Sequence, residues 1–183
     1  MIPEKSYPMT LLKPALIIII GVSGSGKSTL AQALAAHYGY EYLDGDDFHS
    51  PEARALMAAG TPLTDEHRAP WVAAIKQRLE QNAQTYTSTV LAFSGLKQKH
   101  RNELRINGAR ILVLYLKGNK DTIQRRMSLR KGHFMPTSLL DSQFASLEPP
   151  IREPDVRVID IKPRPDLVLE QAKTFTEKYL PLS

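Results

Sequence analysis

Short apolar runs alternate along this chain with segments whose apolar side chains recur every three or four residues. The first pattern predicts strands and the second predicts amphipathic helices. Strands that alternate with helices favour an α/β fold, with a parallel sheet covered by helices on both faces. We expect a five-stranded parallel sheet, with strands at residues 15–20, 40–43, 89–93, 111–116 and 156–161.

Capping residues mark the ends of the predicted helices. Gly39 is suited to end the first helix, and Ser50 opens a second helix that Gly60 closes. Thr64 begins a further helical pattern. We therefore predict two short helices at about residues 49–83, in place of one crossover helix, and interpret them as a substrate-binding insert. Later helices are expected to start at Asn119 or Asp121, and to span 137–146 and 166–179.

The segment from Gly21 to Ser28 reads GVSGSGKS and matches G-x-x-x-x-G-K-[ST] at every fixed position. A predicted strand precedes it and a predicted helix follows, which is the context of a phosphate-binding loop. Lys27 would reach the β- and γ-phosphates of ATP, and the Ser28 hydroxyl would ligate Mg²⁺. The alternative is a Gly/Ser-rich turn without a ligand. The motif predicts a three-layer P-loop NTPase fold, and the expected nucleotide contacts are Gly21, Ser23, Gly24, Ser25, Gly26, Lys27, Ser28 and Thr29.

Three carboxylates, Asp44, Asp46 and Asp47, follow the second predicted strand. Ligands of open α/β sheets bind beyond the carboxyl ends of the strands. A carboxylate there can hold Mg²⁺ or accept the proton of a substrate hydroxyl. We take Asp46 as the candidate for catalysis, substrate binding and metal binding, leave Asp44 open, and interpret Asp47 as a turn or cap residue. No Asp ends the third strand, which increases the weight on Asp44 and Asp46.

Arg68 lies in the predicted insert, next to Pro70. A guanidinium beside a cleft suits the bidentate binding of a substrate carboxylate. The alternative is a surface ion pair with Asp65 or Glu66.

Basic residues also follow the third predicted strand. Lys97 stands at the start of the next helix, where it would meet an anion in the cleft. Arg101 and Arg105 follow at i+4 and i+8 and would share its helix face. We expect Arg105 to be solvated and His100 to be a surface or packing residue.

The helix after the fourth strand ends in basic residues that precede Gly132. Such a segment is typical of a lid that closes over ATP phosphates, and the alternative is charge that complements the helix dipole. Arg126 and Arg130 are the candidate contacts, because residues four apart share a helix face. Arg130 is also a candidate catalytic residue, and the predicted lid spans about residues 126–140.

Length and composition limit the classes of protein. A chain of 183 residues fits a single domain, 1–183, in which we expect residues 1–14 to be a loose leader. The absence of cysteine excludes disulfides, thiolate metal sites and a cysteine nucleophile. The longest apolar run is too short to span a bilayer, and residues 1–13 do not resemble a signal peptide. We therefore expect no membrane association and a cytoplasmic location.

The net charge of +5 suits an enzyme with polyanionic substrates as well as a nucleic-acid-binding protein. The chain has no long Lys/Arg block and only one Trp. A nucleic-acid surface is therefore the weaker interpretation, and we expect a small-molecule substrate.

Motifs from about Leu16 to Leu180 resemble the P-loop gluconokinases, which are relatives of shikimate and nucleoside-monophosphate kinases. The phosphate loop alone indicates only a nucleotide-binding fold. The DGDxxH segment at 44–49 and the GxPLxDxxRxPW segment at 60–71 are much more specific. Further matching segments lie at 94–97, 115–118, 130–134 and 143–148.

The resemblance implies an NMP-kinase-like fold and the phosphorylation of D-gluconate by Mg-ATP to 6-phosphogluconate. Many members are homodimers, which implies a homodimer here. The resemblance implies that Asp46 lies near the transferring hydroxyl. The other residues implied to line the sugar-acid site are His49, Arg68, Lys97 and His133, and those implied for the nucleotide lid are Arg126 and Arg130.

The chain departs from the family pattern at four positions. Gly95 and His100 stand where the family tends to have Ala and Tyr. Ala53 and Leu56 stand where the family usually has Asn and Lys. If the lost side chains contacted the substrate, this chain would phosphorylate another sugar acid or polyol, because a missing polar contact shifts specificity. The alternative is that both positions lie on a surface helix. A regulatory nucleotide-binding protein without catalysis is a third hypothesis, and the presence of Lys27, Ser28 and Asp46 argues against it.

Overall fold

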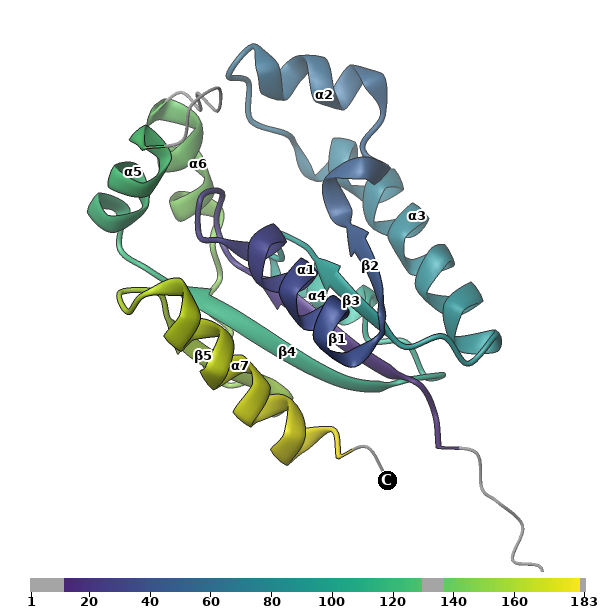
Figure 1. Cartoon of the computed structure of the whole chain (residues 1–183). Coiled ribbons are helices and arrows are strands. Elements are labelled where there is room, and N and C mark those ends of the chain that lie inside the picture. Colours follow the sequence, from purple (N-terminus) through teal and green to yellow (C-terminus); the bar gives the residue numbers. More distant parts are fainter. Residues whose placement is uncertain (1–11, 130–136, 182–183) are drawn as a thin grey trace, which may run out of the picture.

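The computed structural model describes residues 12–129 and 137–181. Its centre is a parallel sheet of five strands, as the sequence predicts, and their order in the sheet is β2-β3-β1-β4-β5 (Figure 1). The strands are β1 (Ala15–Ile20), β2 (Glu41–Asp44), β3 (Thr89–Ala92), β4 (Arg110–Lys117) and β5 (Val156–Asp160).

Helices cover both faces of the sheet (Figure 1). They are α1 (Lys27–Tyr38), α2 (Pro51–Ala58), α3 (Asp65–Gln84), α4 (Gln98–Glu103), α5 (Lys120–Ser128), α6 (Thr137–Ser146) and α7 (Pro165–Tyr179), with a 3-10 turn η1 (Gly45–Phe48) after β2. α1 and α7 lie on one face, and α3 and α4 lie on the other. α2 stands on one side of the carboxyl edge of the sheet, and α5 and α6 stand on the other (Figure 1).

The alternation of side chains along β1 divides the core into two layers, because successive residues of a strand point to opposite faces. Ile17 and Ile19 pack with α1 and α7. Leu16, Ile18 and Ile20 pack with α3 and the segment after α4. Every residue of β1 is buried, as expected of a central parallel strand.

The predicted helix ends are confirmed in α1, α2 and α3. Gly39 ends α1 with φ 68°, and the Ser50 side chain accepts a hydrogen bond from Ala53 N at the start of α2. Thr64 caps α3 together with the ring of His67.

The prediction of two short helices between β2 and β3 was wrong in one respect. α3 has 20 residues and is itself the crossover helix, since Trp71, Ile75 and Leu79 are buried against the sheet. Only η1 and α2 are additional to an ordinary crossover. Pro70 lies in the first turns of α3 and does not end it.

In the two described ranges, no helix combines the length and the apolar composition that a membrane span needs.

Candidate active site

The phosphate loop joins β1 to α1 in the conformation that its glycines allow. Gly24 and Gly26 have φ values of 79° and 95°, a region that side chains rarely adopt. A Cβ on Gly26 would meet no heavy atom within 4 Å, so the requirement there is for the backbone conformation and not for space. Gly26 is also the N-cap of α1 and supplies no side-chain hydrogen bond to the first turn.

Two further observations show that this loop fits phosphate groups. The first-turn N–H groups of α1 lack a side-chain cap, and such groups with the helix dipole attract anions. The Ser25 hydroxyl is buried and has no hydrogen-bond partner in the described part of the chain. A nucleotide phosphate would satisfy both.

A pocket of about 440 Å³ lies on one side of the phosphate loop. Gly24, Ser25, Gly26 and Thr29 form its polar wall, as the motif predicts. Most of its remaining lining is apolar, which suits a flat base and its ribose. Those residues are Leu30, Ala33, Leu116, Leu129, Ile161, Val168 and Leu169.

Arg126 also lines this pocket. Its guanidinium donates hydrogen bonds to the backbone oxygens of Ile161 and Pro163. The side chain is therefore held at the end of β5, beside the space for the nucleoside.

A second cavity, of about 290 Å³, lies on the other side of the phosphate loop. Ser23 and Lys27 reach it from the loop, and Lys27 Nζ donates to Val22 O over 3.0 Å. The predicted residues Asp46, His49 and Arg68 line it too. Its other lining residues come from α2, the α2–α3 turn, α3, the end of β3 and α6, namely Met57, Ala58, Pro62, Leu63, Trp71, Ser94, Leu96, Leu139, Ser142 and Gln143.

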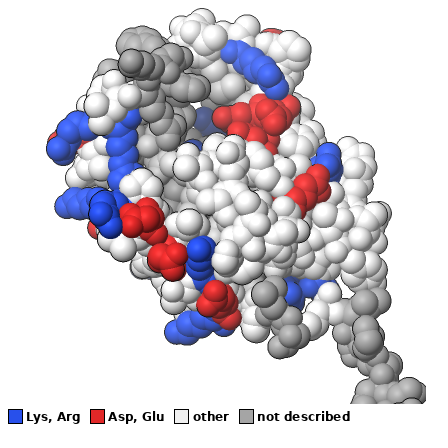
Figure 2. Space-filling model, viewed as in Figure 1, with Lys and Arg blue, Asp and Glu red and all other residues white. Residues whose placement is uncertain are grey.

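Asp44 and Asp46 have different surroundings at the end of β2. Asp44 Oδ2 lies 3.4 Å from the Ser28 hydroxyl and accepts a hydrogen bond of 3.1 Å from the Tyr42 hydroxyl. Its Oδ1 accepts from the backbone N–H of Asp46 at 2.9 Å. The Asp46 side chain is 82% exposed and lines the second cavity. Figure 2 shows acidic side chains gathered below α2, beside a hollow in the surface.

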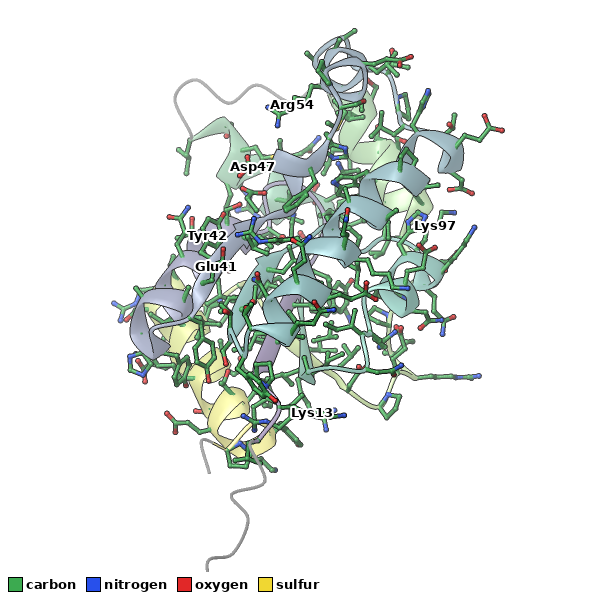
Figure 3. All side chains as sticks on the ribbon, turned by 90° about the vertical axis from the view of Figure 1, so that its right-hand side faces the viewer. Lys13, Glu41, Tyr42, Asp47, Arg54 and Lys97 are labelled. Atoms are coloured by element: carbon green, nitrogen blue, oxygen red, sulfur yellow. The ribbon has the colours of Figure 1, made fainter. Side chains whose placement is uncertain are left out.

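Asp47 takes no part in either cavity, as expected of a turn residue. Its backbone oxygen accepts from Arg54 Nη2 at 3.1 Å, so it ties the turn to α2 (Figure 3).

His49 is buried against Trp71, with ring centroids 4.1 Å apart and an angle of 16° between the rings. Trp71 Nε1 donates to the backbone oxygen of Gly45 at 2.7 Å, which fixes the indole below the acidic turn. Burial is the main cause that lowers the pKa of His49, so its imidazole is neutral near pH 7. His49 Nε2 faces Asp46 at 3.8 Å, and Nδ1 is buried without a partner among the described residues.

Arg68 lies in the second cavity and also faces Asp65, so its position is compatible with both alternatives that the sequence leaves open. Its side chain is only 12% exposed, lines the second cavity, and lies 3.8 Å from the Asp65 carboxylate. That distance is too long for a strong bidentate pair, so the guanidinium retains donors for a ligand carboxylate.

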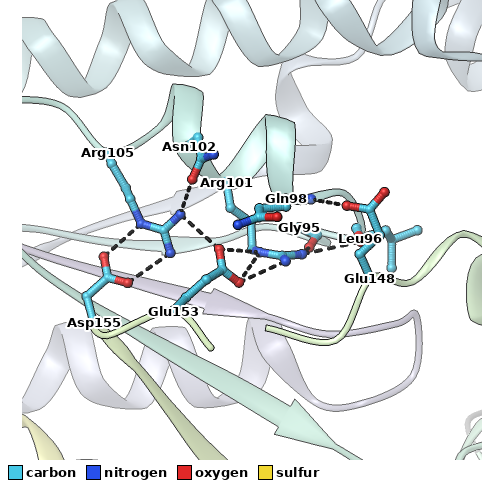
Figure 4. Close-up of polar contacts among 9 residues, drawn as sticks. All are labelled: Gly95, Leu96, Gln98, Arg101, Asn102, Arg105, Glu148, Glu153 and Asp155. Carbon is cyan, nitrogen blue, oxygen red and sulfur yellow. Dashed lines mark hydrogen bonds and ion pairs between the residues drawn. The ribbon is translucent and has the colours of Figure 1, made fainter. Parts of the chain in front are cut away.

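Arg101 and Arg105 are not on a solvated helix face. Arg101 is buried, donates to both carboxylate oxygens of Glu153, and also donates to Gly95 O at 2.6 Å and Leu96 O at 3.3 Å (Figure 4). Arg105 pairs with Glu153 and Asp155, so the expectation of a solvated side chain was wrong. These pairs hold the loop after β3, which forms one wall of the second cavity.

Lys97 is not among the residues that line the second cavity. It lies 3.9 Å from Glu148, and in Figure 3 it lies toward the right-hand edge of the view, well to the right of Asp47. Its predicted contact with an anion in the cleft therefore stays a prediction, although its neighbour Leu96 lines the cavity. His100 is buried and is a packing residue, which is one of the two expected outcomes.

Arg130 and His133 lie outside the described residues, as does part of the predicted lid. Gly21 lies at the end of β1, where its N–H donates to Ser94 O at 3.1 Å. Two residues near the phosphate loop were not predicted as site residues. They are Tyr42, which contacts Asp44, and Gln143, which contacts Ser23. Gln143 stands in a segment that matches the family, and that match was the available signal.

The described residues include no group of three or more His, Asp or Glu side chains that could hold a metal ion. Mg²⁺ in kinases binds through few protein oxygens together with substrate phosphates. The Ser28 hydroxyl and the Asp44 carboxylate are oxygens of the required kind, next to the phosphate loop.

Comparison with known proteins identifies the family. A family model described as an AAA domain matches residues 16–150. The gluconokinase of Gluconobacter oxydans (strain 621H) is 40% identical over 161 residues, which cover 87% of this chain and 90% of the relative. A probable gluconokinase of Mus musculus is 41% identical, over 75% of this chain and 84% of the relative.

Solved structures give the same result. The crystal structure of a gluconokinase from Sinorhizobium meliloti 1021 superposes with a TM-score of 0.81 at 35% identity, covering 94% of this chain and 99% of that one. The chain therefore belongs to the gluconokinase family of P-loop kinases.

Proposed function

We propose that this protein transfers the γ-phosphoryl group of ATP to the terminal hydroxyl of D-gluconate, giving 6-phospho-D-gluconate. The observation that carries the proposal is the position of the phosphate loop between two cavities, one mostly apolar and one with a carboxylate, an imidazole and a guanidinium. The first suits a nucleoside and the second a small polar acid. The names of the relatives support gluconate as that acid.

In this proposal Arg68 binds the carboxylate of gluconate, because a guanidinium forms bidentate hydrogen bonds with a carboxylate. The exposed carboxylate of Asp46 orients the acceptor hydroxyl and accepts its proton. His49 is neutral and hydrogen-bonds the sugar hydroxyls through a ring nitrogen. Its stacking on Trp71 keeps that ring in one orientation.

Lys27 and the backbone N–H groups of the phosphate loop stabilise the charge that develops on the transferring phosphoryl group. The geometry favours Asp44 over Asp46 as the metal-side carboxylate, because Asp44 lies beside Ser28. Ser28 and Asp44 would hold Mg²⁺, Asp44 directly or through water. When bound there, Mg²⁺ would offset part of the negative charge of the phosphates.

Arg126 is proposed to contact the nucleotide from the pocket that it lines. Nucleotide contacts by Arg130, its candidate catalytic role and a substrate contact by His133 stay predictions, as do the homodimer and the cytoplasmic location.

The alternative acceptor, another sugar acid or polyol, rested on Ala53 and Leu56. Neither residue lines the second cavity. Ala53 is buried, and its N–H donates to the Ser50 hydroxyl, whereas Leu56 is half-buried on the same helix. This supports gluconate over the alternative.

The test is ADP release from Mg-ATP with a panel of gluconate, other sugar acids, shikimate and free sugars. Selective turnover with gluconate is expected. Lys27→Ala should reduce this turnover by orders of magnitude. Lys76→Ala, a lysine in a surface pair with Glu80, should not change it. Gluconate turnover no greater than that of Lys27→Ala would contradict the proposal.

A further inference from the structure

Gln143 on α6 holds Ser23 of the phosphate loop with both ends of its carboxamide. Its Oε1 accepts a hydrogen bond of 2.7 Å from Ser23 N, and its Nε2 donates one of 2.9 Å to Ser23 Oγ. Only a neutral amide side chain offers an acceptor and a donor in this arrangement. The two residues are 120 positions apart in the sequence, so this contact joins distant parts of the chain.

The contact stands at the boundary between the two cavities. Gln143 and Ser23 both line the second cavity, which the proposed function assigns to the acceptor and which is called the acceptor cavity from here on, together with Lys27 and Asp46. The next residue of the loop, Gly24, lines the nucleotide pocket. Any phosphoryl group passing from one side to the other therefore passes the residue that Gln143 holds.

α6 itself is fixed by other contacts. Leu140 is buried in the core, Phe144 packs against the same core layer, and Asp141 forms an ion pair with Lys120 of α5. Just after α6, Glu148 N donates to Leu96 O at 2.7 Å, and its carboxylate accepts from Gln98 N at 2.8 Å. Gln143 thus extends from a rigid helix, and the loss of its carboxamide would not release that helix.

We propose that Gln143 is a positioning residue for phosphoryl transfer: it fixes Ser23, and with it the phosphate loop, relative to the acceptor cavity. The inference rests on the proposed kinase function and adds a residue to it. Phosphoryl transfer depends mainly on alignment and electrostatics, and a misplacement of about 1 Å can cost on the order of 100-fold in rate. A loop held only by its own turn would sample more positions.

Three variants test this role. Gln143→Leu removes donor and acceptor at nearly constant size. Gln143→Glu keeps an acceptor for Ser23 N–H, loses the donor, and adds a negative charge near the phosphates. Gln171→Leu makes the same change as the first variant at an exposed position of α7 and serves as the control.

Kinetics with Mg-ATP and gluconate give the first readout. For Gln143→Leu we expect kcat to fall about 10- to 100-fold, with the KM for gluconate changed by less than about threefold. Gln143→Glu should lose at least as much, and Gln171→Leu should match the wild type. Thermal unfolding identifies a variant that does not fold, and the other Gln143 variant then carries the test. A wild-type kcat in a folded Gln143 variant would overturn the proposal.

Hydrogen exchange of the Ser23 amide, followed by NMR without nucleotide, gives a readout that does not depend on the acceptor. We expect Gln143→Leu to accelerate this exchange about fivefold or more, the effect of losing one hydrogen bond. Equal exchange in wild type and variant would overturn the proposal. An inactive wild-type protein with this acceleration would instead contradict the gluconate assignment and retain the role of Gln143 in fixing the loop.

Discussion

The Ser28 hydroxyl and the Asp44 carboxylate face one another at 3.4 Å, so the phosphate loop and the end of β2 meet at one point. If this is where Mg²⁺ binds, Asp44→Asn should raise the Mg²⁺ concentration for half-maximal activity by about tenfold or more, because a neutral amide is a weaker ligand for a hard cation. Asp46→Asn should lower kcat without this change. The measurement is the rate as a function of free Mg²⁺ at saturating ATP. An equal dependence on Mg²⁺ in Asp44→Asn and wild type would exclude the assignment of Asp44.

The buried pair of Arg101 and Glu153 should be important for stability. Their side chains are 3% and 7% exposed, and Arg101→Met would leave the Glu153 charge with less compensation. We expect the free energy of unfolding to fall by about 3–5 kcal/mol, as measured by urea denaturation. The matched control is Lys76→Met, which breaks an exposed pair with Glu80 and should cost less than about 0.5 kcal/mol. Equal losses in the free energy of unfolding for the two variants would contradict the expected importance of the buried pair for stability.

The departures at α2 should not affect acceptor choice. Since Ala53 and Leu56 do not line the acceptor cavity, Leu56→Lys should leave the ratio of kcat/KM between gluconate and other sugar acids unchanged within about threefold. Ala53→Asn places a larger side chain in a buried position and should lower stability by about 1–3 kcal/mol, with the same substrate preference. A change of preferred acceptor in either variant would mean that α2 contributes to substrate recognition.

Two buried histidines predict a loss of stability in mild acid. Burial lowers the pKa of both His49 and His100 below their ordinary value of about 6.5. As the pH falls through 6.5, the unfolded chain takes up protons that the folded chain does not, so the free energy of unfolding decreases. Above that pH both states are neutral at these positions and the effect vanishes. The double variant His49→Gln/His100→Gln should show a flatter dependence between about pH 6.5 and 5 in urea denaturation, and an unchanged slope would refute this cause.

Local signals in the sequence predicted the sheet, the phosphate loop and most helix ends. Such signals depend on residues close together in the chain, such as Gly26 next to Lys27 or Ser50 three residues before Ala53. Together with the family resemblance, these signals also predicted that Asp46, His49 and Arg68 belong to one site. All three line the second cavity.

The remaining features depend on partners far away in the sequence. We expected Arg105 to be solvated because the helical pattern does not show its partners. Glu153 and Asp155, in the segment before β5, accept its hydrogen bonds. No local pattern indicates that Asp44 lies 3.4 Å from Ser28, or that Gln143 bonds Ser23. Periodicity identifies which side chains share a helix face, but it does not identify the partner that the face meets.

The central claim is that the phosphoryl group goes to the terminal hydroxyl of gluconate, and product analysis tests it most directly. Purified protein with Mg-ATP and gluconate should yield one ADP per molecule of product, and ³¹P and ¹H NMR should show a phosphate ester at C6 only. An ester at another carbon, or ADP release without any phosphorylated gluconate, would contradict the account.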